Sequence, residues 1–137
     1  MFPSMFESTT IPVLEQVVNF SQARHEVLAG NVANMDTPGY RARDLSPEQF
    51  HTRLKEAIDS GKQTNLSLSG EDGSPAIATS MGKVRESMDN LLYHDDSNDS
   101  LEQQVAEISK NQMQHNMALT ILTSQFRLLQ TAISERV

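Results

Sequence analysis

Residues 100–137 read SLEQQVAEISKNQMQHNMALTILTSQFRLLQTAISERV, and this stretch decides the fold class. Ser100 is suited to cap a helix, and Gln103 three residues later completes the pattern of a capping box. Apolar residues then recur in alternating steps of four and three, which is the period of a left-handed coiled coil. The predicted seam consists of Leu101, Val105, Ile108, Gln112, His115, Leu119, Leu122, Phe126, Leu129 and Ile133.

Further apolar surface lies beyond this seam, at Met113, Met117, Ile121 and Leu128. One neighbouring helix covers only one stripe of a helix surface. The C-terminal helix is therefore expected to have more than one packing neighbour.

A second long amphipathic helix is expected from Thr9 to about Asp36. Ser8, Thr9 or Thr10 can cap it, and Pro12 is tolerated in its first turn. Its apolar stripe has the same alternating steps of four and three. The stripe consists of Leu14, Val18, Ser21, His25, Leu28, Val32 and Met35, and is widened by Val13, Val17, Phe20 and Val27.

This helix has a well-marked end. Pro38 disfavours the α conformation at Thr37, so the helix should end within a residue or two of Asp36. The order Thr37-Pro38-Gly39-Tyr40 suits a type II turn, in which Gly39 takes a positive φ.

The middle of the chain is predicted to hold a short helix and then a flexible loop. The helix spans Pro47 to Ser60, with Ser46 as its cap, Gln49 completing a capping box and Gly61 closing it. From residue 62 to about residue 82 the composition is polar and rich in Ser and Gly, which predicts a mobile loop. Residues 84–93 fit either a short helix or an extended segment.

The expected fold is mainly α, with the two long terminal helices forming a coiled-coil-like pair. Three parts are expected: an N-terminal helix and turn over 1–40, a middle region over 41–99 and a heptad helix over 100–137. Two helices alone leave much of this apolar surface uncovered unless other chains pack against it. The sequence therefore indicates a subunit of an assembly.

Composition narrows the possible functions. A formal net charge of −7 without a basic cluster argues against nucleic-acid binding, and 37% hydrophobic residues without Trp argue against a large independent core. The absence of Cys excludes disulfides and thiolate chemistry. The N-terminus lacks the pattern of a Sec signal peptide, and no long apolar stretch predicts a membrane span.

No catalytic residue, cofactor site or metal site is predicted. Phosphate-binding, nucleophile-elbow and zinc-helix motifs are missing from the sequence. His25 and His115 lie on the predicted seams, where a packed or hydrogen-bonded histidine is the simpler interpretation. Residues 96–107 contain a calcium-loop spacing, but Leu101 replaces the required Gly and a helix begins inside the supposed loop.

The most distinctive segment is LAGNVANMDTPGY, residues 28–40. Two Asn residues one turn apart are unusual in a helix, because Asn competes for backbone hydrogen bonds. The segment resembles the signature of the flagellar rod and hook axial family. The matching positions are Leu28, Ala29, Asn31, Val32, Ala33, Asn34, Thr37, Gly39 and Tyr40, and Pro38 lies within the same turn.

Within that family, the continuation YRARD at residues 40–44, the short chain and the run NQMQHNMAL at residues 111–119 are similar to a proximal-rod subunit. One departure is His115, where the family has an aromatic residue. The resemblance implies a structural subunit of the flagellar proximal rod, which transmits torque and forms part of the export channel in the periplasm.

The resemblance also implies partners and a route of export. The expected partners are further copies of the chain, FlgC, FliE, and membrane-ring and export-gate proteins, without nucleic acid or membrane insertion. Export is expected to pass through the flagellar type III apparatus, without a cleaved Sec signal. Two alternatives stay open: a helical secretion chaperone or coiled-coil adaptor, and another rod protein such as FlgC.

Overall fold

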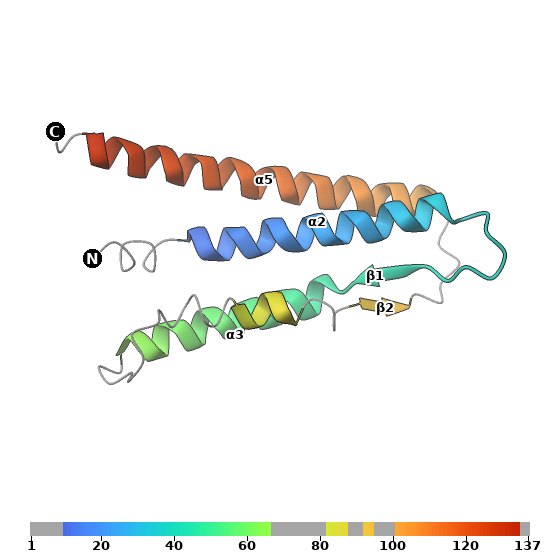
Figure 1. The fold of residues 1–137 in the computed structure, drawn as a ribbon, viewed down its shortest axis with the longest axis horizontal. Coiled ribbons are helices and arrows are strands. Elements are labelled where there is room, and N and C mark those ends of the chain that lie inside the picture. The colour runs from blue at the N-terminus through green and yellow to red at the C-terminus, as the bar shows by residue number, and fades with distance from the viewer. Residues whose placement is uncertain (1–9, 67–81, 88–91, 95–100, 135–137) are drawn as a thin grey trace.

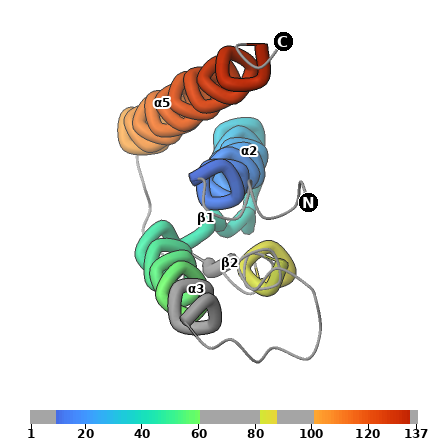
Figure 2. Tube along the Cα trace, turned by 90° about the vertical axis from the view of Figure 1, so that its left-hand side faces the viewer, coloured from blue at the N-terminus to red at the C-terminus, as the bar shows by residue number. Residues whose placement is uncertain are grey.

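The computed structural model describes residues 10–66, 82–87, 92–94 and 101–134. The described chain is mainly helical, as predicted, and its elements lie in layers. The long helix α5 lies on α2, and α2 lies on a layer that holds α3, a short helix at residues 82–86 and two short strands (Figures 1 and 2). The elements in chain order are α2 (Ile11–Ala33), β1 (Arg43–Leu45), α3 (Pro47–Leu66), β2 (Leu92–His94) and α5 (Leu101–Ser134).

The two long helices form an antiparallel pair, which confirms the predicted pairing of the terminal helices (Figure 1). Pro12 lies in the first turn of α2, where its missing N–H costs no hydrogen bond. Thr10 is the cap residue, but its side chain makes no capping hydrogen bond.

The helix α2 ends at Ala33, about three residues before the predicted end. The side chain of Asn34 donates to the carbonyl of Gly30 over 2.8 Å, so it satisfies an acceptor at the helix end. The amide of Thr37 then donates to the carbonyl of Asn34 over 2.9 Å. Local turns that begin at Asn34 therefore end the helix before Pro38 can.

The predicted turn over residues 37–40 is present. The amide of Tyr40 donates to the carbonyl of Thr37 over 3.1 Å, and Gly39 has a φ of +77°. A side chain is strained at such a φ, so glycine is the residue that this turn favours.

The hydrophobic core lies between α2 and the layer of α3, and not between the two long helices. Phe20 of α2 stacks on Phe50 of α3, with ring centroids 4.1 Å apart and an interplanar angle of 9°. Burying each of these rings contributes roughly 1.5–3 kcal/mol. The other buried members of the cluster are Leu45, Leu54, Ala57 and Val84.

The middle of the chain differs from its predicted course. The helix α3 continues to Leu66, so the prediction that Gly61 closes it is wrong, and residues 62–66 are helix instead of loop. A Gly inside a helix costs only about 1 kcal/mol, which the rest of this amphipathic helix can offset. The amide of Gln49 donates to Ser46 Oγ over 3.3 Å, which confirms Ser46 as the cap. The remaining predicted loop residues at 67–81 lie outside the described residues.

Residues 84–93, which fitted either a short helix or an extended segment, include parts of both. Residues 82–86 form a helical turn, and β2 at residues 92–94 pairs antiparallel with β1, with Asp44 opposite Tyr93. This two-stranded ribbon was not predicted, because three-residue strands show too little alternation to be recognised. It places β1 beside α2, where the polar contacts of the next section form.

Two glycine substitutions should have opposite effects on stability. Gly39→Ala should destabilise the chain by about 1 kcal/mol, because an added Cβ meets no atom within 4 Å and only the backbone conformation at φ +77° is penalised. Gly30→Ala should stabilise it by about 0.5–1 kcal/mol, because Gly30 is helical and its added Cβ also meets nothing within 4 Å. Urea unfolding of both variants checks this, and equal shifts would contradict the assigned turn.

Candidate assembly interface

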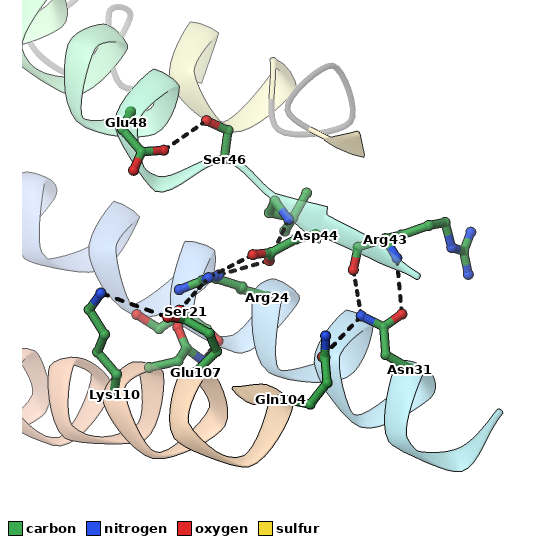
Figure 3. Close-up of polar contacts among 12 residues, drawn as sticks. Ser21, Arg24, Asn31, Arg43, Asp44, Ser46, Glu48, Gln104, Glu107 and Lys110 are labelled. Carbon is green, nitrogen blue, oxygen red and sulfur yellow. Dashed lines mark hydrogen bonds and ion pairs between the residues drawn. The ribbon is translucent and has the colours of Figure 1, made fainter. Parts of the chain in front are cut away.

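A buried arginine joins three elements of the fold (Figure 3). Arg24 of α2 donates through Nε and Nη2 to the carboxylate of Asp44 in β1, over 2.8 and 2.7 Å. Its Nη2 also donates to Glu107 of α5 over 2.9 Å. The contact with Asp44 is bidentate, a geometry that fixes the orientation of both groups.

The charge of this arginine is secured by its partners. Burial by itself lowers the pKa of the Arg24 guanidinium, but the hydrogen bonds and charges of Asp44 and Glu107 more than offset this effect. The pKa is raised above its ordinary value, so Arg24 stays positive at every accessible pH. Arg24 and the two carboxylates form a permanent ionic link between α2, β1 and α5.

Asn31, about two helical turns after Arg24 on α2, links the same elements (Figure 3). Its Nδ2 donates to the carbonyl of Arg43 over 2.6 Å, and its Oδ1 accepts from the amide of Arg43 over 3.1 Å. It therefore pairs with β1 as a strand backbone would. Asn31 Oδ1 also accepts from the Tyr40 hydroxyl over 3.0 Å, and Nδ2 donates to Gln104 over 3.4 Å. The unusual helical Asn thus holds the chain that follows the turn against α2.

The side of α5 that faces α2 is polar or small. Gln104, Asn111 and Ala118 are buried there, at intervals of seven residues. Asn111 Nδ2 donates to the carbonyl of Ser21 over 2.7 Å, while its Oδ1 and His115 Nδ1 are buried without a partner among the described residues. The partly buried residues Ile108, His115, Leu122 and Leu129 follow the same seven-residue interval beside them.

The seven-residue period of α5 is as predicted. At every second position of the predicted seam, however, the residue that faces α2 is the one just before the predicted residue. Large apolar residues predicted for the seam are exposed in the single chain. We call them the heptad face, which consists of Leu101, Val105, Leu119, Phe126 and Ile133. The polar bonds of Asn111, Gln104 and Glu107 to α2 account for the shift, because they are made only when these residues face α2.

A second apolar surface on α5 is still more exposed. We call it the Met face, and it consists of Met113, Met117, Ile121 and Leu128. Met113 is 75% exposed and Met117 is 65% exposed. Contiguous apolar surface of this kind marks an interaction site in a folded protein.

The predicted interface residues are distributed over three environments. Buried residues are Leu28 and Asn31. Partly buried residues are Leu14, Val18, Val32, Asn34, Tyr40, Ile108, Leu122 and Leu129. Exposed residues are Thr37, Pro38, Gly39, Leu101, Val105, Leu119, Phe126 and Ile133.

The structure brings Asn31 and Tyr40 together through a hydrogen bond, and it exposes His25, which was expected to pack on a seam. Sequence reasoning missed Arg24, Asp44 and Glu107 as a linking group. The seven-residue spacing of Arg24 and Asn31 was a signal for their shared side of α2, since seven residues are close to two helical turns.

Among the described residues, no group of His, Cys, Asp and Glu could hold a metal ion, and no helix is long and apolar enough to cross a membrane. The C-terminal two thirds of α5 carry very little charge. Between Asn111 and Ser134, Arg127 is the only Asp, Glu, Lys or Arg, although the chain as a whole carries a formal charge of −7. Depletion of charge is typical of the centre of protein interfaces.

Residues 19–41 match the family described as flagella basal body rod protein. These residues contain Arg24, Asn31 and the turn up to Tyr40.

Relatives that align over most of the chain identify the particular family. The flagellar basal body rod protein FlgB of Salmonella typhimurium is 31% identical over 82% of this chain and 84% of its own length. The FlgB proteins of Escherichia coli and Bacillus subtilis are 27% and 25% identical, over 82% and 93% of this chain and 84% and 95% of their own lengths. This chain belongs to the FlgB family of flagellar basal body rod proteins. No solved structure matches it significantly.

The family assignment decides between the functional alternatives. The chain is a structural subunit of the flagellar basal body rod, and it assembles with other basal body components. The relatives do not favour a secretion chaperone, a coiled-coil adaptor or FlgC. The family is one of structural rod proteins and not a family of enzymes.

Proposed function

We propose that this chain is a subunit of the proximal rod, where its apolar helical surfaces pack against neighbouring subunits and transmit torque. This proposal rests on the exposure of the heptad face and the Met face along α5. Each Leu, Ile or Phe that neighbours bury contributes roughly 1.5–3 kcal/mol, so several such residues supply a strong drive for assembly.

The polar contacts at Arg24 and Asn31 support a mechanical role. They join α2 to both β1 and α5 by bonds of 2.6 to 3.4 Å. Bidentate and buried contacts resist rotation of one helix against another, because a small rotation breaks their geometry. A subunit that carries torque needs such links between its layers.

The proposed neighbours are further copies of the chain, FlgC, FliE, and membrane-ring and export-gate proteins. In this arrangement, residues 1–40 and 100–137 form the wall around the export channel, and residues 41–99 lie on its outer side. The core between α2 and α3 supports attachment of the middle region to the N-terminal helix. In this proposal, the chain reaches the periplasm through the flagellar type III apparatus.

Isolated basal bodies test this proposal. Cells without the gene should build no rod and should not swim, and the parent gene should restore both. An immunoblot should find the chain in basal bodies stripped of their outer filament. Rods that assemble normally without the chain would contradict the proposal.

A further inference from the structure

Among the described residues, the two methionines of the Met face are the most exposed sulfur-containing side chains. Met113 is 75% exposed and Met117 is 65% exposed, whereas Met35, just after the end of α2, is 38% exposed. Met113 and Met117 are four residues apart, so they are neighbours on one side of α5. An oxidant in the surrounding water therefore reaches both sulfur atoms.

The composition of the chain directs oxidation to methionine. An exposed cysteine thiolate would be a competing target for a peroxide, but the chain contains no Cys. The oxidant must reach the sulfur atom, so exposed methionines react before buried ones. The pair at Met113 and Met117 is thus the expected target among the described residues.

We propose that Met113 and Met117 are sites of reversible oxidation by hydrogen peroxide, and that their sulfoxides keep the free subunit out of the rod. A lone pair of the thioether sulfur attacks one peroxide oxygen, and an S=O bond forms while the O–O bond breaks. The proton of the transferred oxygen passes to the other oxygen, which leaves as water. Sulfur is oxidised by two electrons and the peroxide is reduced by two. This inference rests on the proposed burial of the Met face in the rod.

The reverse step restores the apolar side chain. Methionine sulfoxide reductases remove the oxygen as water, and a dithiol supplies the two electrons and becomes a disulfide. An oxidised subunit can therefore return to its assembly-competent form.

The sulfoxide changes the Met face and leaves the single chain intact. Neither methionine belongs to the core cluster around Phe20 and Phe50, and the bond of α5 to Ser21 is made by Asn111. In the free chain, water solvates the sulfoxide oxygen. Burial against a neighbour would leave that oxygen without a donor, and a buried polar group without a partner is costly. Oxidation therefore opposes assembly and not folding.

Mass spectrometry after graded peroxide treatment measures the first step. In the purified chain, sulfoxide should form at Met113 and Met117 about twofold faster than at Met35, in line with their exposure. In isolated basal bodies, the rate at both positions should fall at least about tenfold, because neighbours cover the Met face. Oxidation of both methionines no faster than that of Met35 in the free chain would overturn the inference. Rapid oxidation of both in basal bodies would instead contradict the proposed burial, and with it the proposed function.

Two double variants separate the polarity of the sulfoxide from the loss of methionine. Met113→Gln with Met117→Gln places a polar side chain of similar length at both positions, and Met113→Leu with Met117→Leu keeps both apolar. Leu, Met and Gln have similar helix propensities, so α5 should form in both variants. The Gln pair should lower incorporation into basal bodies at least about tenfold, and the Leu pair should leave it within about twofold of the parent.

A brief exposure of growing cells to hydrogen peroxide completes the test. In cells that lack methionine sulfoxide reductases, the treatment should lower incorporation of the newly made parent chain several-fold relative to the Leu pair. An immunoblot of isolated basal bodies measures this ratio. Equal incorporation of the parent and the Leu pair after peroxide, or normal incorporation of the Gln pair, would overturn the inference.

Discussion

Met117→Asp should abolish incorporation of the chain into the rod and stop swimming, while the isolated chain folds as the parent does. Met117 is 65% exposed in the single chain, so the charge is solvated there. In the rod, the proposed packing of the Met face against neighbouring subunits buries it. An unpaired buried carboxylate costs several kcal/mol, and about 1.4 kcal/mol is already a tenfold change in an equilibrium.

The neighbouring substitution Asn116→Asp is the matched control. Asn116 is exposed on the polar side of α5, and the new carboxylate keeps the acceptor oxygen for Gln112. It adds the same charge one residue away and should leave incorporation within about twofold of the parent. The measurement is an immunoblot of isolated basal bodies beside circular dichroism of the purified chains. Equal incorporation of the two variants would show that the Met face is not buried in the rod.

Arg24→Met should destabilise the isolated chain by about 2–3 kcal/mol. The substitution leaves Asp44 and Glu107 without their cation, with side chains that are 13% and 34% exposed. The expected cost is below that of a fully buried ion pair, since water reaches Glu107. Arg24→Lys should recover part of the loss, because it keeps the charge but not the bidentate geometry.

Lys110→Met is the control, because it removes a different positive charge that also lies close to Glu107. Lys110 is 76% exposed and lies 3.9 Å from Glu107, so its removal should change stability by less than about 0.5 kcal/mol. Urea unfolding of the four proteins gives the free energies. If Arg24→Met and Lys110→Met change the free energy of unfolding equally, the ionic link between α2, β1 and α5 contributes no net stability.

Much of the fold was predictable because it depends on local patterns. The period of residues 100–137 predicts one long helix, and α5 covers Leu101–Ser134 of that range. The order Thr37-Pro38-Gly39-Tyr40 predicts a turn with Gly39 at positive φ, and that turn is present. The end of α2 was predicted less well, since the bond of the Asn34 side chain to Gly30 competes with the effect of Pro38.

The assignment of faces to neighbours was not predictable in this way. Periodicity identifies which residues share a side of a helix, but several sides of α5 are apolar. The partner of each side depends on contacts between distant residues, such as Asn111 with Ser21 and Glu107 with Arg24. The predicted seam was therefore correct in period, while only its positions at Ile108, His115, Leu122 and Leu129 are partly buried and the others are exposed.

The sequence by itself determined the helical class and the two long terminal helices, because both follow from spacing along the chain. It also carried the resemblance of residues 28–40 to axial proteins. Only the tertiary structure decided that Phe20 and Phe50 form the core and that Arg24 links three elements. It also decided that the largest apolar side chains of α5 face outward. The physical reason is that polar groups buried on folding must find partners, and for α5 those partners lie on α2.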